Sequence, residues 1–202
     1  LLTLPATVAL IVCGEPITSA LFGYGRFTAE DVTATSYALA AFSIGLPAYI
    51  LVKVLTPGYY ARHDTKTPVR FALISMVVNL VLNLALIPTI GHIGPPLATA
   101  AAATVNVALL YYTLKKRGHF VADDQLKRRA LRLAIAALLM GAALWPMMAL
   151  FDAYVHGEWW VRAITMAVLV GTGALVYAVA TLLSGAFTLT ELKAQLTRKK
   201  AK

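Results

Sequence analysis

Charged residues divide the chain into long apolar stretches separated by short charged segments. None occurs between Asp31 and Lys53, and none between Arg70 and Lys115. A helix needs about 20 apolar residues to cross about 30 Å of hydrocarbon, so stretches of this kind predict membrane-spanning helices. The second stretch is about twice as long as one crossing requires. Residues 88–96 interrupt it with prolines and glycines, which predicts a hairpin of two helices.

The pattern predicts an all-α fold, a polytopic transmembrane helix bundle of about six spans. The expected spans cover residues 1–21, 30–56, 68–88, 95–115, 130–151 and 160–184, and a basic tail follows at 188–202. Local signals at helix ends agree with this division. Thr28 with Asp31 approximates a capping box. Thr67 with Pro68 is typical of an N-cap followed by the first helical residue, and Ser184-Gly185 of a helix stop.

Composition supports lipid as the solvent of this chain. Hydrophobic residues make up 59% of the sequence and charged residues 13%, whereas soluble domains are about half apolar and about a quarter charged. The net charge of +9 would suit a nucleic-acid binder, but its distribution favours membrane topology and no nucleic-acid partner. Lys and Arg concentrate in residues 53–70, 115–132 and the C-terminal tail. The positive-inside rule therefore predicts that loops 54–68 and 115–130 and the C-terminus are cytoplasmic.

Motifs of enzymes and metal sites are missing from the sequence. It contains no His-Glu-x-x-His, no Gly-x-Ser-x-Gly and no Walker-type glycine loop. No Cys/His cluster has metal-ligand spacing, and a single cysteine, Cys13, excludes an intrachain disulfide. We therefore expect a protein that is not an enzyme and that holds no metal centre or organic cofactor.

The densest charge lies between the second and third expected spans. Its candidate headgroup-binding residues are Lys53, Arg62, Asp64, Lys66 and Arg70. One interpretation is a solvated loop that fixes topology, with Asp64 or Thr67 capping the next helix. The other is the cytoplasmic mouth of a cavity that attracts an anionic headgroup such as a diphosphate. Lys53 is the leading candidate because it is predicted at the end of a span, where snorkelling to the interface is the alternative explanation.

Polar side chains within the spans form a second candidate site. Asn79 and Asn83 are four residues apart and share one helix face, and Thr99 belongs to the following helix. An isolated amide in lipid is costly, so these groups should face protein or water. They could form hydrogen bonds between helices. They could also form an oxygen-lined site for a monovalent cation, Na⁺ or H⁺, with backbone carbonyls near Gly94 contributing.

Three short motifs give the chain a family resemblance. They are Val52-Lys53-Val54-Leu55, Pro57-Gly58-Tyr59-Tyr60 and Arg62-x-Asp64-Thr65-x-Thr67-Pro68-Val69. Together with the preceding stretch from Leu21 to Thr28, this sequence resembles the MurJ/MviN family of lipid II flippases. The resemblance is strongest over residues 16–90, and further along it rests on helix number, spacing and the basic loop at 115–132.

The resemblance implies a specific architecture. The family belongs to the superfamily of multidrug and polysaccharide exporters, and its members have fourteen transmembrane helices in two lobes. This chain, which starts within an apolar run at Leu1, would be the last six helices, and its partner would be the N-terminal lobe of the same protein. The last two spans would form a groove for a lipid tail. A sodium site is associated with C-lobe helices of the family. Asn79, Asn83 and Thr99 occupy the corresponding region, with Asn83 in place of an expected carboxylate.

The resemblance also implies a function, a flippase in the bacterial inner membrane. It would move the undecaprenyl-diphosphate-linked peptidoglycan precursor between leaflets by alternating access of two lobes. Membrane lipid and the lipid-linked precursor would be its partners. Because the chain has no nucleotide motif, membrane potential or an ion gradient would drive it. Two alternatives stay open, an exporter of another cargo such as a polysaccharide unit or a drug, and a non-transporting scaffold for cell-wall enzymes.

Overall fold

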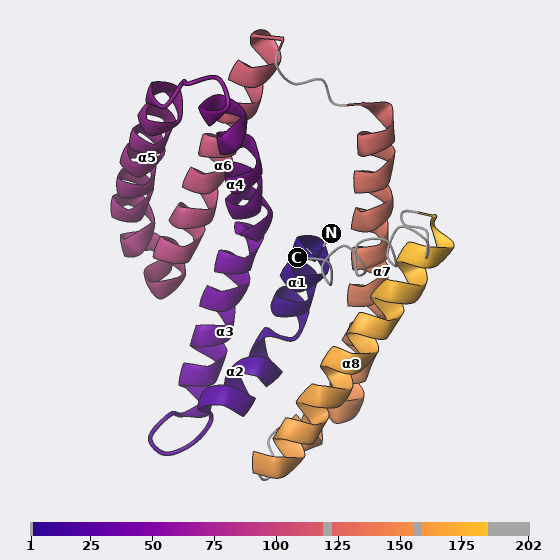
Figure 1. The fold of residues 1–202 in the computed structure, drawn as a ribbon. Coiled ribbons are helices and arrows are strands. Elements are labelled where there is room, and N and C mark those ends of the chain that lie inside the picture. Colours follow the sequence, from indigo (N-terminus) through magenta and orange to yellow (C-terminus); the bar gives the residue numbers. More distant parts are fainter. Residues whose placement is uncertain (1, 119–122, 156–158, 186–202) are drawn as a thin grey trace, which may run out of the picture. The chain divides into compact units, whose positions relative to one another are not determined.

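The computed structural model describes residues 2–118, 123–155 and 159–185, and all of their regular structure is helical (Figure 1). The elements are α1 (Thr3–Val12), α2 (Gly14–Phe22), α3 (Ala29–Ile44), α4 (Leu46–Tyr60), α5 (Lys66–Ile90), the 3₁₀ helix η1 (Gly91–Ile93), α6 (Gly94–Lys116), α7 (Asp124–Val155) and α8 (Trp159–Leu183). The prediction of an all-α protein is confirmed. The basic tail predicted at 188–202 lies outside the described residues.

Four helical stretches are long and apolar enough to cross a membrane. They are Ala29–Tyr60, Lys66–Lys116, Asp124–Phe151 and Trp160–Leu183. Helices α1 and α2, bent by 76° at their junction, make a fifth if the pair counts as one span. The stretch Lys66–Lys116 contains both α5 and α6, which pack side by side (Figure 1). With 25 and 23 residues, each is long enough to cross alone. Counting α5 and α6 separately gives the six spans expected from hydropathy.

Helix ends follow two of the three predicted signals. The capping box before α3 is present, because Asp31 N donates to Thr28 Oγ1 at 3.2 Å and Thr28 N donates to Asp31 Oδ2 at 2.9 Å. Helix α8 ends at Leu183, just before Gly185 with φ of +63°. The prediction of Thr67 as an N-cap is wrong, because α5 already begins at Lys66. The Asp64 carboxylate accepts a hydrogen bond from the Thr67 backbone N–H at 3.0 Å. It thereby satisfies one of the N–H groups that the first turn of α5 leaves without a partner within the helix.

Prolines do not end the helices where the sequence suggests. Helix α4 was expected to stop near residue 56, yet it continues through Pro57 to Tyr60. A proline removes one backbone hydrogen bond, here the one to the Lys53 carbonyl. Packing of Tyr59, in the last turn of α4, against Leu110 and Leu114 of α6 offsets that loss. Lys53 therefore lies within α4, two turns before the helix ends at Tyr60. Helix α5 likewise passes Pro88, and the chain reverses at Gly91, where φ is +57°.

The chain divides into two compact units, residues 10–121 and residues 1–9 with 122–202. In the first unit, α6 packs against α3, α4 and α5. A buried cluster of Leu55, Tyr59, Leu110 and Leu114 joins α4 to α6. In the second unit, α7 packs against α8, with Leu144 and Leu169 nearly inaccessible.

A close helix contact lies at the junction of α3 and α4. Gly45 has helical backbone angles (φ −77°, ψ −15°) and separates the two helices. A Cβ at this position would lie 2.8 Å from Ala100 Cα and 2.9 Å from Tyr49 Oη. Only a residue without a side chain allows this approach of the α3–α4 junction to α6.

Candidate functional site

An open groove of about 410 Å³ is bounded by α4, α5 and α6. Its lining consists of Tyr49, Val52, Lys53, Ala72, Ser75, Met76, Asn79, Thr99, Ala102, Ala103 and Asn106. The groove brings Lys53, predicted as a headgroup residue, together with Asn79 and Thr99, predicted as cation ligands. We therefore take these residues as parts of one candidate site.

Two lining residues were not among the predicted site residues, although Asn106 is a polar residue within an apolar span, as Asn79 and Asn83 are. Tyr49 Oη and Asn106 Oδ1 are both buried, and neither has a hydrogen-bond partner among the described residues. Helical spacing could have found them. Tyr49 precedes Lys53 by four residues and so shares its helix face, and Asn106 follows Thr99 by seven residues, or two turns.

The three cation candidates form one hydrogen-bonded chain between α5 and α6. Asn79 Nδ2 donates to Thr99 Oγ1 at 3.1 Å, and Thr99 Oγ1 donates to the Pro95 carbonyl at 2.8 Å. Asn83 Nδ2 donates to Asn79 Oδ1 at 3.0 Å and to the Asn79 carbonyl at 2.9 Å. This arrangement satisfies polar groups that lipid cannot solvate. A cation bound by Asn79 Oδ1 would compete with the Asn83 amide. The described parts of the chain hold no cluster of His, Cys, Asp or Glu suited to a metal ion.

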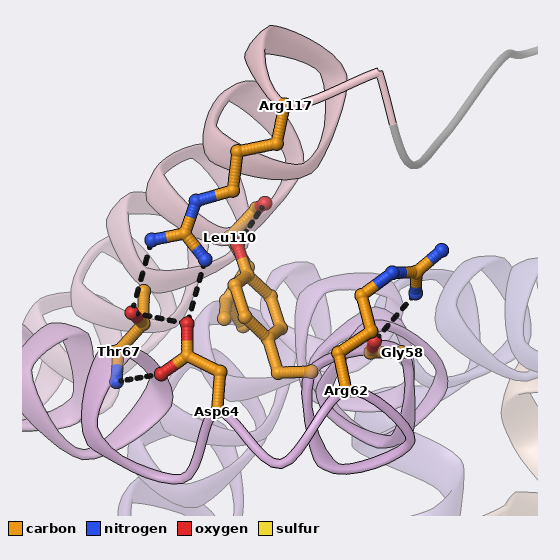
Figure 2. Close-up of polar contacts among 7 residues, drawn as sticks. Gly58, Arg62, Asp64, Thr67, Leu110 and Arg117 are labelled. Atoms are coloured by element: carbon orange, nitrogen blue, oxygen red, sulfur yellow. Dashed lines mark hydrogen bonds and ion pairs between the residues drawn. The ribbon is translucent and has the colours of Figure 1, made fainter.

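Asp64 lies at the centre of an ionic clamp, which we define as Asp64, Thr67 and Arg117. Asp64 Oδ2 accepts from Arg117 Nη1 at 2.6 Å and from Thr67 Oγ1 at 2.6 Å (Figure 2). Arg117 Nη2 also donates to Thr67 Oγ1 at 3.3 Å. Hydrogen bonds from the Thr67 hydroxyl and from Arg117 hold the pKa of Asp64 well below its usual range. The clamp ties the α4–α5 turn to the end of α6, so Asp64 is engaged with residues of its own chain.

Arg117 also packs over a buried aromatic ring. Its guanidinium carbon lies 5.9 Å from the centroid of the Tyr59 ring, within the range of a cation–π contact. Tyr59 is 1% exposed, and its hydroxyl donates to the Leu110 carbonyl at 2.7 Å. The sequence placed Arg117 in a basic loop and gave no signal for this role, since its partner Asp64 is 53 residues away.

The remaining basic candidates do not line the groove. Arg62 Nη1 donates to the Gly58 carbonyl at 2.8 Å and so caps the last turn of α4 (Figure 2). Lys66 and Arg70 are exposed on the first turns of α5. The structure thus separates Lys53 from the other four predicted headgroup residues, which surround the α4–α5 turn.

A second groove, of about 510 Å³, runs along α8 where it packs against α7. Its lining is apolar except for one serine and consists of Leu139, Leu175, Val176, Val179, Ala180, Leu183 and Ser184. These two helices are the spans for which the family resemblance predicts a lipid-tail groove. An apolar groove without charged lining suits an acyl or polyprenyl chain.

Comparison with known proteins gives consistent matches. The family model described as "Lipid II flippase MurJ" matches residues 1–170. The chain is 42% identical over 174 residues to a probable lipid II flippase MurJ of Rhizobium meliloti, covering 86% of this chain and 31% of that protein. It is 41% identical over 196 residues to the one of Vibrio cholerae, covering 96% of this chain and 37% of that protein.

A solved structure agrees with these sequence matches. It is described as "Lipid II flippase MurJ, inward closed conformation", and it superposes with a TM-score of 0.73 at 26% identity. The match covers 90% of this chain and 35% of that one. The chain therefore spans about a third of the length of the relatives that it matches.

Proposed function

The chain belongs to the lipid II flippase MurJ family, and from this premise we propose that it forms the C-terminal lobe of a lipid II flippase. The complete protein would carry the undecaprenyl-diphosphate-linked precursor across the bacterial inner membrane and would catalyse no covalent chemistry. The observation that carries the proposal is the groove of α4, α5 and α6, with Lys53 in the helical stretch Ala29–Tyr60, which is long and apolar enough to span a membrane. Charged side chains within membrane segments are costly and mark functional sites or transport pathways.

The proposed mechanism assigns separate surroundings to the two ends of the cargo. The anionic head would contact the groove that contains Lys53, and the apolar groove along α8 would hold the polyprenyl tail. The remaining two-thirds of the protein would supply the opposing lobe, and rocking of the two lobes would expose the head to each side of the membrane in turn.

Orientation and energy coupling are parts of the same proposal. Placing the α4–α5 turn in the cytoplasm follows from the basic residues around it, Arg62, Lys66 and Arg70. The C-terminus would then also be cytoplasmic. A monovalent cation, Na⁺ or H⁺, would couple transport to an ion gradient, with Asn79, Asn83 and Thr99 as its candidate ligands. Its binding would require the Asn83 amide to leave Asn79 Oδ1.

The test uses the full-length protein in cells depleted of their own lipid II flippase. We expect restored growth, and purified protein in vesicles should transfer fluorescent lipid II between leaflets. Failure of the full-length protein in both assays would refute the proposal. Transfer of a polysaccharide unit or a drug but not of lipid II would identify an exporter of another cargo. If variants that neutralise Lys53 and Arg62 still transferred lipid II but no longer recruited partner enzymes, the result would favour a scaffold.

A further inference from the structure

We propose that the junction of α3 and α4 at Gly45 is a hinge, about which an arm of α2 and α3 moves against a rigid block of α4, α5 and α6. The movement opens and closes the lobe at the end where η1 joins α5 to α6. The groove that contains Lys53 is lined by the block alone, so its shape does not change. The role of the hinge in transport rests on the proposed flippase function, whereas the movement can be measured independently of it.

The backbone at the junction departs from a continuous α-helix. Gly45 N donates to the Phe42 carbonyl at 3.0 Å, which lies only three residues back and so has the spacing of a 3₁₀ turn. Pro47, in the first turn of α4, has no N–H to donate to the Ser43 carbonyl four residues back. Short 3₁₀ turns within long helices often mark hinges, and prolines are common sites of kinks. The 32-residue stretch Ala29–Tyr60 therefore has one weak point, at its middle.

The contact beside the junction suits rotation about a point. Gly45 is buried against Ala100 of α6, so closely that a Cβ on Gly45 would lie 2.8 Å from Ala100 Cα. Helices that meet through small residues can turn about the contact with little repacking, because no long side chains interdigitate there. Tyr49 Oη is buried at the same place, 2.9 Å from the position of that Cβ, and has no hydrogen-bond partner among the described residues. An unpaired buried hydroxyl costs free energy, which lowers the difference from a second arrangement that pairs it.

The block is held together by polar contacts spread along α6. They join α6 to α4, to α5 and to the turn between them. The pairs are Arg117 with Asp64, the Leu110 carbonyl with Tyr59, the Ala102 carbonyl with Ser75, and Thr99 with Asn79. Within a membrane no water replaces a broken hydrogen bond, so separating these helices is costly. The three helices should therefore move as one body.

The arm is held differently, by close packing of small residues. The hydroxyls of Thr33, Ser36 and Ser43 all donate to carbonyls of α3 itself rather than to another helix. The buried residues of α3 are no larger than valine, namely Val32, Ser36, Ala41 and Ser43. Helix α2 packs directly on α3, since a Cβ on Gly14 would lie 3.4 Å from the Ser36 carbonyl oxygen. The two helices of the arm thus fit each other closely and can slide over α6 without breaking these hydrogen bonds.

Distances between spin labels on the full-length protein in nanodiscs test the movement. Labels at Glu30→Cys in α3 and Leu84→Cys in α5 report on the arm against the block, and Val54→Cys in α4 with Leu84→Cys is the control pair within the block. All three positions are exposed, and Cys13 and any other cysteine are replaced first. We expect two distances for the first pair, with populations that change when lipid II is added, and one unchanged distance for the control pair. A single, unchanged distance for the first pair would overturn the hinge, and a control distance that changes would overturn the rigid block.

Pro47→Ala tests the hinge without adding volume. The new N–H can bond the Ser43 carbonyl and so favours the straighter arrangement of α3 and α4. One net hydrogen bond shifts a two-state equilibrium by about fivefold, so one of the two label distances should lose about that much of its population and lipid II transfer should slow. The thermal midpoint should stay the same or rise. Pro88→Ala makes the same change at an exposed position inside α5 and should leave label distances and transfer unchanged.

The outcomes separate the hinge from folding and from the proposed function. Wild-type distances and transfer in Pro47→Ala would overturn the hinge. Slower transfer with a lowered thermal midpoint would also overturn it, since Pro47 would then act through packing. If the wild type transfers lipid II with one fixed arm distance, the hinge fails and the flippase function stands. If the wild type shows two arm distances but transfers no lipid II, the flippase function fails and the hinge stands.

Discussion

The same glycine-to-alanine change should have opposite effects on stability at Gly45 and Gly171. Gly171 lies within α8, and Gly45 has helical backbone angles at the junction of α3 and α4, so alanine gains about 0.5–1 kcal/mol at either position. At Gly45 the new Cβ would lie 2.8 Å from Ala100 Cα, which belongs to the backbone of α6 and cannot rotate away. Overpacking of this kind costs about 1–3 kcal/mol, and the very short contact places the cost at the upper end. We expect Gly45→Ala to lower the free energy of unfolding by about 1–2 kcal/mol.

Gly171 is the matched control, since no atom lies within 4 Å of a Cβ built there. Only the propensity term remains, and Gly171→Ala should raise the free energy of unfolding by about 0.5–1 kcal/mol. The assay is unfolding of the full-length protein in micelles by increasing mole fraction of dodecyl sulfate, followed by circular dichroism. A stabilising effect at Gly45 would refute the steric argument. Adding Ala100→Gly to Gly45→Ala should recover part of the loss, because it removes the Cβ at 2.9 Å.

Three further predictions use the same unfolding assay. Tyr59→Phe should lose about 1 kcal/mol with its hydrogen bond, whereas Tyr59→Ala should lose about 3 kcal/mol or more through the cavity it leaves; equal losses would contradict the packing role of the ring. Because the folded-state pKa of Asp64 is depressed, its contribution is present above its unfolded pKa of about 4 and is lost as pH falls below it. Asp64→Asn should abolish that part of the acid dependence, and an unchanged pH profile would count against the clamp. Thr28→Ala should cost about 1 kcal/mol by removing the α3 cap, and no change would show that Asp31 caps alone.

The helices could be predicted because the bilayer restricts the possible structures. A spanning segment must satisfy its backbone hydrogen bonds internally, so an apolar stretch of sufficient length implies a helix. The positions of helix ends depend on tertiary contacts instead. Helix α4 passes Pro57 because Tyr59 is anchored to the Leu110 carbonyl of α6. This contact leaves no signal in the local sequence, so the sequence predicted that the helix stops near residue 56.

The candidate site could be predicted only in pieces. Lys53 and Asn79 were recognisable as costly residues within apolar stretches, each on its own helix. That they share a groove depends on the rotation of α4 relative to α5 and α6, which local sequence does not encode. The clamp shows the same limit, since Asp64 and Arg117 are far apart in the chain. Tyr49 and Asn106 matter because their neighbours leave them unpaired, a property that exists only in the folded chain.

The α5–η1–α6 hairpin has a consequence for how the protein enters the membrane. Its turn is only three residues long, Gly91–Ile93, and carries no acidic, lysine or arginine side chain, so translocating it should require little energy. The Asn79–Thr99 hydrogen bond joins the two arms, which means that neither arm enters lipid with that amide unsatisfied. We therefore expect the two helices to leave the insertion machinery as a pair, with the hairpin serving as the template on which α3 and α4 assemble.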